Sequence, residues 1–119
     1  MISSIWRKLD SLGYIVEEQD ISFERIDEET FRIDGKIVFA NGYSLEFMEY
    51  SSPENHDYRF HLMDESDNLV KRWDNAPHHE ELENFPFHVH VSEDKIEPDK
   101  QRELVSVLDE IEKIIVENL

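Results

Sequence analysis

The sequence predicts an α+β fold in which an antiparallel meander of about five strands lies between a helix at each end of the chain. Apolar residues recur at helical spacing in the first and last segments, and they alternate with polar residues through most of the middle. Turn-forming pairs separate the alternating runs. With 119 residues, the chain is expected to form one domain over residues 1–119, with both helices packed on one face of the sheet.

The first segment has the pattern of an amphipathic helix. Ser3 or Ser4 is a suitable N-cap, and Gly13 is a suitable point for the helix to end. The apolar residues at helical spacing are Ile5, Trp6, Leu9 and Leu12. We therefore expect a short helix with these side chains turned toward the sheet.

From residue 15 to residue 64 the apolar period changes to two, as expected for strands with one buried face. The alternating apolar residues of the first strands are Ile21, Phe23, Phe31, Ile33, Ile37, Phe39, Leu45 and Phe47. The acidic run Asp27-Glu28-Glu29 interrupts them and is expected to be a solvated turn. Asn41-Gly42 lies between two alternating runs, which predicts a tight hairpin and a return strand over residues 43–49.

Two further strands are expected after a loop at residues 51–55. Since alternate residues of a strand point to opposite faces, the first of them has an inward and an outward set. The inward set is Tyr58, Phe60 and Leu62, and the outward set is Arg59, His61 and Met63. A turn at residues 64–68 leads to the second strand, from Leu69 to Trp73.

The segment from Asp74 to Phe87 is expected to be irregular because it contains Pro77 and Pro86. The sequence then predicts a short extended segment over residues 87–91. The last helix is expected to begin with Asp99 as its cap, directly after a proline. Its apolar stripe comprises Leu104, Val107, Leu108, Ile111, Ile114 and Ile115.

The charge balance restricts the classes of partner. There are 29 acidic against 12 basic residues and a formal net charge of −17, which opposes general nucleic-acid binding through a basic surface. A high-salt cytosol or a basic protein partner would each suit such a surface. The chain has no cysteine, hence no disulfide and no thiolate metal site. It has no apolar run of membrane-spanning length and no signal-peptide pattern, so we expect a cytoplasmic location and no membrane partner.

A cluster of histidines is the main candidate for chemistry. Five of the six histidines fall within thirty residues, and they are His61, His78, His79, His88 and His90. His88 and His90 are two residues apart, so on a strand they point the same way. Histidine is both the commonest metal ligand and the side chain most ready to transfer protons near neutral pH.

In a metal site, His88 and His90 would share one ion with Asp74 or with one of His78 and His79. In an acid–base site that cleaves RNA, one group deprotonates the 2′-hydroxyl, another protonates the leaving oxygen, and a cation stabilises the phosphate. We favour proton transfer without a metal or other cofactor, because adjacent histidines diverge and nearby carboxylates can orient imidazoles. The candidate catalytic residues are His78, His79, His88, His90, Arg72 and Asp74. The candidate substrate-binding residues are Arg59, His61, Lys71 and Asn75.

Two observations favour a non-catalytic alternative. Asp74-Asn75 and Pro77 are ordinary turn formers, so this loop could be a structural latch in a module that binds a protein partner. From His56 to His90 there are also eight acidic against three basic residues, so an RNA site would require folding to focus the basic side chains. No nucleophile motif or glycine-rich phosphate loop is present.

One stretch, Arg72-Trp73-Asp74-Asn75-Ala76-Pro77-His78-His79, followed by Phe85-Pro86-Phe87-His88-Val89-His90, resembles the signature of TumE-like toxins of prokaryotic toxin–antitoxin systems. That signature is roughly Arg-aromatic-Asp-Asn-Ala-Pro-His-His, a short spacer, Pro and a His-x-His pair. The resemblance runs from about Ile21 to Ile115 and includes residues 41–50, 58–61 and 107–111.

The resemblance implies a toxin that is neutralised by a helix-turn-helix antitoxin encoded beside it. It also implies that the family's histidine groups correspond to His78, His79, His88 and His90, together with Arg72, Asp74 and Asn75. We therefore expect a toxin that is an RNA-directed nuclease with a histidine-rich site, with RNA and the antitoxin as partners. The non-catalytic module stays the alternative, and the sequence leaves open whether the chain forms a homodimer.

Overall fold

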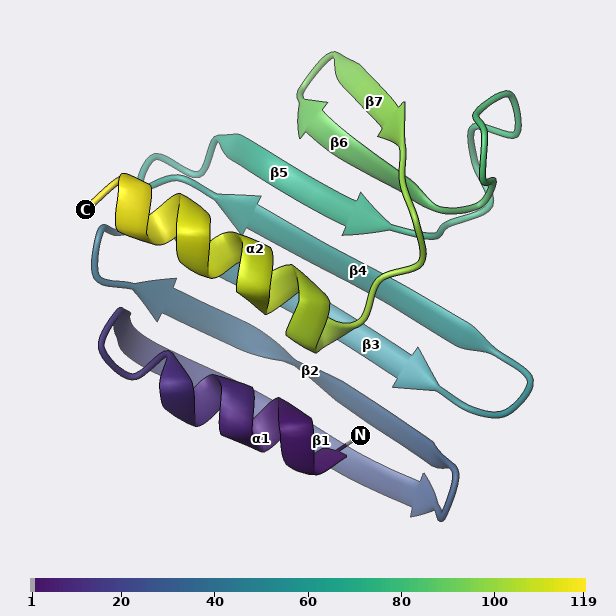
Figure 1. The fold of residues 1–119 in the computed structure, drawn as a ribbon, viewed down its shortest axis with the longest axis horizontal. Coiled ribbons are helices and arrows are strands. Elements are labelled where there is room, and N and C mark those ends of the chain that lie inside the picture. Colours follow the sequence, from purple (N-terminus) through teal and green to yellow (C-terminus); the bar gives the residue numbers. More distant parts are fainter. Residues whose placement is uncertain (1) are drawn as a thin grey trace.

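Two helices pack on the same face of an antiparallel sheet of seven strands in the computed structural model, which describes residues 2–119 (Figure 1). In chain order the elements are α1 (Ile2–Ser11), β1 (Val16–Asp27), β2 (Thr30–Phe39), β3 (Ser44–Ser51), β4 (His56–Met63), β5 (Leu69–Asp74), β6 (His88–Ser92), β7 (Lys95–Pro98) and α2 (Leu104–Glu117). The strands lie side by side in chain order from β1 to β7. The predicted α+β class, the meander and the helices on one face are confirmed. None of the described helices is long and apolar enough to cross a membrane.

The predicted number of about five strands is wrong, and the edges of the sheet explain the error. Strand β7 has four residues, of which only Ile96 is a large apolar side chain, so no alternation marks it in the sequence. It nevertheless pairs with β6, with Val89 opposite Glu97. At the other edge, β1 is largely exposed along its twelve residues, so its apolar pattern covers only the part around Ile21 and Phe23. An edge strand pairs with a neighbour on one side only and is open to water on the other. Few of its residues therefore have to be apolar.

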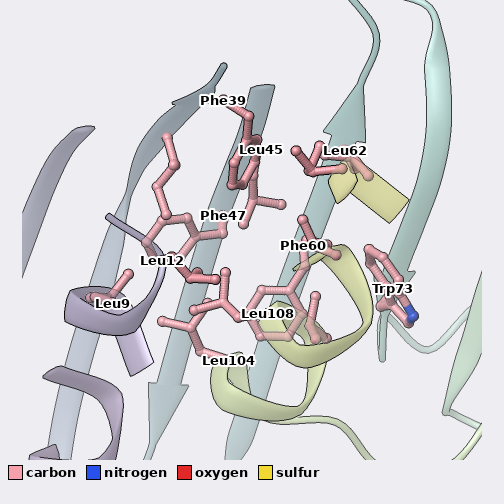
Figure 2. Close-up of a cluster of buried hydrophobic side chains, with 14 of the residues drawn as sticks. Leu9, Leu12, Phe39, Leu45, Phe47, Phe60, Leu62, Trp73, Leu104 and Leu108 are labelled. Atoms are coloured by element: carbon pink, nitrogen blue, oxygen red, sulfur yellow. The ribbon is translucent and has the colours of Figure 1, made fainter. Parts of the chain in front are cut away.

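The hydrophobic core fills the space between the sheet and the helices (Figure 2). Its fully buried members from the sheet include Ile33, Ile37, Phe39, Leu45, Phe60, Leu62 and Trp73. On the helix side, the fully buried residues are Leu12, which directly follows α1, and Leu104, Val107, Leu108, Ile111 and Ile115 of α2. Trp6 departs from the predicted apolar face, since it is 40% exposed and packs edge-on against Phe23.

Both predicted helix caps are wrong. Helix α1 begins at Ile2, so Ser3 and Ser4 lie inside its first turn. Helix α2 begins at Leu104 with Glu103 as its N-cap, and the Glu103 N–H donates to the Ser106 hydroxyl at 3.1 Å. Asp99 instead accepts two hydrogen bonds from Arg102, at 3.0 and 3.1 Å. The chain therefore runs from β7 to α2 through a short irregular connection.

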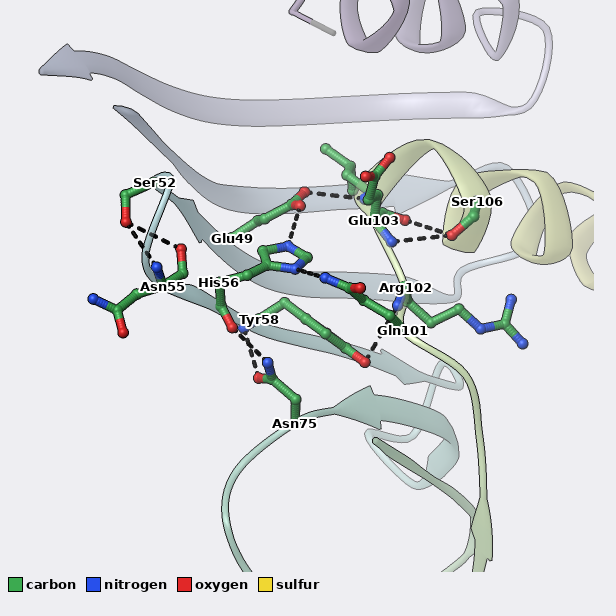
Figure 3. A network of polar contacts seen from close by, with 11 residues as sticks. Glu49, Ser52, Asn55, His56, Tyr58, Asn75, Gln101, Arg102, Glu103 and Ser106 are labelled. Atoms are coloured by element: carbon green, nitrogen blue, oxygen red, sulfur yellow. Dashed lines mark hydrogen bonds and ion pairs between the residues drawn. The ribbon is translucent and has the colours of Figure 1, made fainter. Parts of the chain in front are cut away.

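A buried carboxylate on β3 holds the N-terminus of α2 against the sheet (Figure 3). Glu49 is 3% exposed, and its Oε1 accepts the Leu104 N–H at 3.0 Å. Its Oε2 lies 2.7 Å from Nε2 of His56, and Nδ1 of His56 lies 2.7 Å from the Gln101 amide. An anion at a helix N-terminus is stabilised by the free N–H groups and the helix dipole. Glu49 and His56 thus connect β3, β4 and α2.

Stability should depend on pH through His56. The hydrogen bond to Glu49 raises the pKa of the His56 ring above its ordinary value, against the opposing effect of burial. Since the folded pKa lies above the unfolded value of about 6.5, this contribution is fully present below pH ~6.5 and is lost as pH rises through the folded pKa. We expect the free energy of unfolding of His56→Gln, measured by urea denaturation, to lack this decline. A wild-type-minus-variant difference that stays flat across that window would contradict the role of His56.

Candidate functional site

The sheet face opposite the helices carries polar side chains in two rows that cross β3 to β6. The first row consists of Glu46, His61, Arg72 and His90, and the second consists of Met48, Arg59, Asp74 and His88. Each row follows the strand register, because residues paired across neighbouring strands point to the same face. We call this the open face. It places Arg59 and His61 as the alternation of β4 predicts, and it brings His88 and His90 together as their spacing predicts.

Asp74 organises the second row from the end of β5. The residue is 6% exposed, and its Oδ1 lies 2.8 Å from Nε2 of His88. Its Oδ1 also accepts the Ala76 N–H at 3.1 Å, which fixes the start of the loop after β5. Nε of Arg72 lies 3.3 Å from Oδ2 without hydrogen-bond alignment, so this contact is an ion pair only. One buried carboxylate thus orients an imidazole, a guanidinium and a loop.

The two histidines of β6 have different surroundings. Nδ1 of His88 donates to the Pro86 carbonyl at 2.9 Å, so its Nε2 is the nitrogen that faces Asp74. Nη2 of Arg72 lies 3.0 Å from Nε2 of His90 and can only donate, so this imidazole nitrogen accepts. Burial, followed by the charge of Arg72, lowers the pKa of His90 to about 4. His90 is therefore neutral at pH 7.

His61 lies next to Arg72 in the first row, on the side opposite His90. Burial lowers the pKa of His61, and the charges of Arg59 and Arg72 lower it further. Its Nδ1 is buried and has no hydrogen-bond partner among residues 2–119. Arg72 therefore lies between two imidazoles that its own charge helps to keep neutral.

The loop from residue 75 to residue 87 adds one more imidazole to this group. The ring centroid of His79 lies 5.2 Å from that of His88 and 6.1 Å from that of His90. His79 adopts a positive φ of 60°, which is uncommon for a residue other than glycine and turns its ring toward β6. His78 is exposed and lines a neighbouring cavity instead. The adjacent histidines thus diverge, and only His79 joins the group.

Of the residues predicted to bind substrate, Lys71 lies away from the open face, and Asn75 uses its side chain for contacts with β4. Lys71 contacts Glu110 of α2, and its Nζ lies 5.5 Å from the centre of the Trp73 ring, on the side of the helices. Asn75 holds the loop to β4, because its Nδ2 donates to the His56 carbonyl at 2.6 Å and its Oδ1 accepts the Tyr58 N–H at 3.0 Å (Figure 3). Lys71 is therefore left out of the site, and the contacts of Asn75 are structural.

Two adjoining cavities hollow the open face. One of about 400 Å³ is lined by Arg32, Glu46, Phe47, Met48, Arg59 and His61. The other, of about 460 Å³, is lined by Met48, Asp57, Tyr58, Arg59, Arg72, Asp74, Asn75, Ala76, Pro77 and His78. Arg59 lines both, and within residues 2–119 its guanidinium makes no ion pair or hydrogen bond. A chain with a net charge of −17 thus presents an unpaired cation in the middle of this face.

Arg32, Glu46 and Met48 are among the residues of these cavities that sequence reasoning missed. Glu46 and Met48 alternate with the inward Leu45 and Phe47, so the sequence alone could have placed them on the outward face of the sheet. Their proximity to His61 and Arg59 depends on the pairing of β3 with β4, which a hairpin over residues 51–55 would have suggested. Arg32 reaches the cavity from β2, and no local pattern marks that contact.

The group formed by His79, His88 and His90 also has the arrangement of a metal-ligand set. One ligand atom from each of these residues lies within 4.8 Å of the others. The ligand set considered from the sequence paired His88 and His90 with Asp74 or with one of the two loop histidines. The structure brings His79 to the pair, and it keeps Asp74 in contact with Nε2 of His88. The group therefore contains three imidazoles, and Asp74 lies beside two of them, with Oδ1 at 2.8 Å from Nε2 of His88 and Oδ2 at 3.7 Å from Nε2 of His90.

A comparison with protein families agrees with the resemblance of the histidine-rich stretch. The family model described as Toxin TumE matches residues 6–118. The match includes every residue of the open face described above. No curated protein and no solved structure matches the chain.

Proposed function

The chain belongs to the TumE toxin family, and on that premise we propose that it is a toxin that cleaves RNA at its open face. The observation that carries this proposal is the row His61–Arg72–His90, in which a guanidinium lies between two imidazoles. Metal-free cleavage of RNA needs a cation for the phosphate and side chains that accept and donate protons. The unpaired Arg59 beside this row adds a second cation.

In the proposed reaction, Arg59 and Arg72 bind the phosphate that is to be cleaved. As Arg72 turns to the phosphate it leaves Nε2 of His90. The imidazole of His61 or that of His90 then accepts the proton of the 2′-hydroxyl. The 2′-oxygen then forms a bond to phosphorus while the bond from phosphorus to the 5′-oxygen breaks. His79, which approaches from the loop, supplies the proton to the leaving 5′-oxygen. The products are a 2′,3′-cyclic phosphate and a 5′-hydroxyl end, so atoms and charges balance without an oxidant or a cofactor.

Folding gathers basic side chains from different strands on the open face, which supports the proposal despite the acidic composition. Arg32, Arg59 and Arg72 come together along the two cavities of the open face, which Glu46, Asp57 and Asp74 also line. Arg32 and Arg72 each have a carboxylate partner, so within the described part of the chain Arg59 is the cation of this group that is free to bind a phosphate. A single RNA strand would lie across β3 to β5 with its phosphates on these arginines.

A toxin of this family implies an antitoxin partner. We assign this partner a helix-turn-helix architecture, as the resemblance suggests, and a cytoplasmic location for both proteins. DNA-binding proteins of that kind are basic, so the acidic surface outside the open face suits such a partner. Antitoxin binding would then involve a surface different from the arginines that bind RNA.

One observation favours the alternative of a non-catalytic interaction module. Asn75 and Asp74 use their side chains to hold the loop to β4 and to residue 76, as a structural latch would. A latch does not explain why Arg59 is unpaired, however. The RNA-cleaving toxin therefore requires Arg59 for RNA binding, whereas the interaction module does not.

Replacing Arg59 by Gln is expected to weaken the binding of single-stranded RNA and to lower the salt dependence of binding. Loss of one phosphate contact should reduce the slope of log affinity against log salt by about 0.7. The measurement is fluorescence anisotropy with a labelled RNA at several salt concentrations. Arg7→Gln is the control, since it removes the same charge from an exposed position on α1. Equal losses in the two variants would show that Arg59 acts only through net charge and would contradict an RNA site on the open face.

A further inference from the structure

We propose that His79, His88 and His90 bind one divalent transition-metal ion of the zinc class, with Asp74 as the fourth ligand. The first observation is the convergence of three imidazoles, whose ligand atoms lie within 4.8 Å of one another. Two of the three, His88 and His90, are buried on a strand in the middle of a ladder, so their positions are fixed by the fold. Three protein imidazoles and a carboxylate form a ligand set that Zn²⁺ accepts.

The second observation is the orientation of His88. Its Nδ1 donates to the Pro86 carbonyl at 2.9 Å, which directs Nε2 toward Asp74 Oδ1 at 2.8 Å. A histidine ligand in a metal site has this arrangement, because its second nitrogen donates to a carbonyl or carboxylate and fixes the ring. Two donor atoms on one zinc ion are about 3.3 Å apart, so His88 Nε2 and Asp74 Oδ1, now at 2.8 Å, need to separate by about half an ångström to share the ion.

The third imidazole has to move to complete the site. Bonds of 2.0–2.1 Å in a tetrahedron bring ligand nitrogens to about 3.4 Å from one another, whereas the present group extends to 4.8 Å. His79 comes from the loop and is partly exposed. Among the described residues, its side chain contacts Glu81 at 3.7 Å and the ring of His78 outside the group, and its carbonyl accepts the Leu82 N–H at 3.0 Å. A small displacement of the loop therefore closes the site.

Arg72 opposes the ion. Its Nη2 lies 3.0 Å from Nε2 of His90, so a cation in the group meets a positive charge at close range. The guanidinium can turn toward Asp74 Oδ2, which Nε already approaches at 3.3 Å. Arg72 therefore lowers the affinity for the ion, and its removal should raise that affinity.

The ligand types determine which ions compete. Imidazoles suit Zn²⁺, Ni²⁺ and Co²⁺, whereas Mg²⁺ and Ca²⁺ prefer sets made of oxygen ligands. The ion would occupy the nitrogen lone pairs of His79 and His90, which proton transfer also uses. Metal binding itself is independent of the proposed function, but its consequence, inhibition of RNA cleavage, rests on that function.

The test is titration of the purified full chain with Co²⁺, followed by its absorption bands, and with Zn²⁺, followed by calorimetry. We expect one ion per chain, with absorption typical of tetrahedral cobalt. His79→Ala should weaken binding about tenfold or more, and His78→Ala, its exposed neighbour, should leave it unchanged. Arg72→Gln should tighten binding. Circular dichroism and thermal unfolding confirm that each variant is folded.

Three results would overturn the proposal: no stoichiometric binding by the wild-type chain, equal losses in His78→Ala and His79→Ala, or weaker binding by Arg72→Gln. None of these readouts uses RNA, so they are separate from the test of the proposed function. Cleavage that occurs in a chelator and stops on addition of Zn²⁺ would agree with both proposals. Cleavage that requires the ion would overturn the metal-free chemistry and the predicted inhibition while leaving the metal site in place.

Discussion

Replacing His79 by alanine is expected to relieve the growth inhibition that the wild-type protein causes when it is expressed without its antitoxin. His79 is assigned the proton that the leaving 5′-oxygen needs, and loss of such a group slows catalysis by about 10²- to 10⁴-fold. The residue is suitable for the test because its side chain packs on the imidazoles of β6 and lies outside the hydrophobic core. The measurement is the growth rate after induction, at matched protein levels.

A neighbouring substitution provides the control for this experiment. Glu80→Ala changes an exposed residue of the same loop that has no hydrogen bond or ion pair among the described residues. It should therefore stay as toxic as the wild type. If folded His79→Ala protein inhibits growth as strongly as Glu80→Ala, His79 has no part in toxicity.

Asp74→Ala is expected to lower the free energy of unfolding by about 3 kcal/mol, because it leaves partners of a buried carboxylate uncompensated. The substitution removes the contacts to His88, Arg72 and the Ala76 N–H at 2.8, 3.3 and 3.1 Å. Arg72 keeps partial access to water, which places the estimate at the lower end of the range for buried pairs. Urea unfolding followed by tryptophan fluorescence measures the loss, since Trp73 adjoins the site in sequence and is fully buried.

Asp34→Ala is the matched control for Asp74. Asp34 also forms an ion pair with an arginine on β2, at 3.0 Å, but both side chains are largely exposed. An exposed pair contributes at most about 1 kcal/mol, so this variant should unfold almost like the wild type. Equal destabilisation by the two substitutions would show that burial of Asp74 does not set its energetic role.

Much of the open face could be predicted because strand alternation is a local rule. The inward positions of Tyr58, Phe60 and Leu62 place Arg59 and His61 on the other side, and the spacing of His88 and His90 places them together. Applied to β5, the same rule separates Lys71 from the site to which we assigned it. Lys71 has the parity of the buried Trp73, so it points to the helices, whereas Arg72 and Asp74 point away from them.

The features that could not be predicted depend on contacts between distant parts of the chain. Glu49 of β3 binds the N-terminus of α2, so the helix begins at Leu104 and a cap at Asp99 is not needed. Strand β7 exists because β6 offers a free edge, although its own residues carry little apolar signal. The approach of His79 to His88 depends on the path of an irregular loop, for which no periodic rule applies.

The central claim is that the open face cleaves RNA by proton transfer, and one measurement tests it most directly. The purified protein is incubated with a single-stranded RNA in the presence of a chelator, alongside the same RNA with deoxyribose at every position. We predict that the ribose substrate is cut to fragments with 2′,3′-cyclic phosphate ends, that the deoxyribose substrate stays intact, and that His79→Ala protein cuts about 10²-fold or more slowly. Intact ribose RNA with folded wild-type protein, or equal cutting by the wild type and His79→Ala, would contradict the claim.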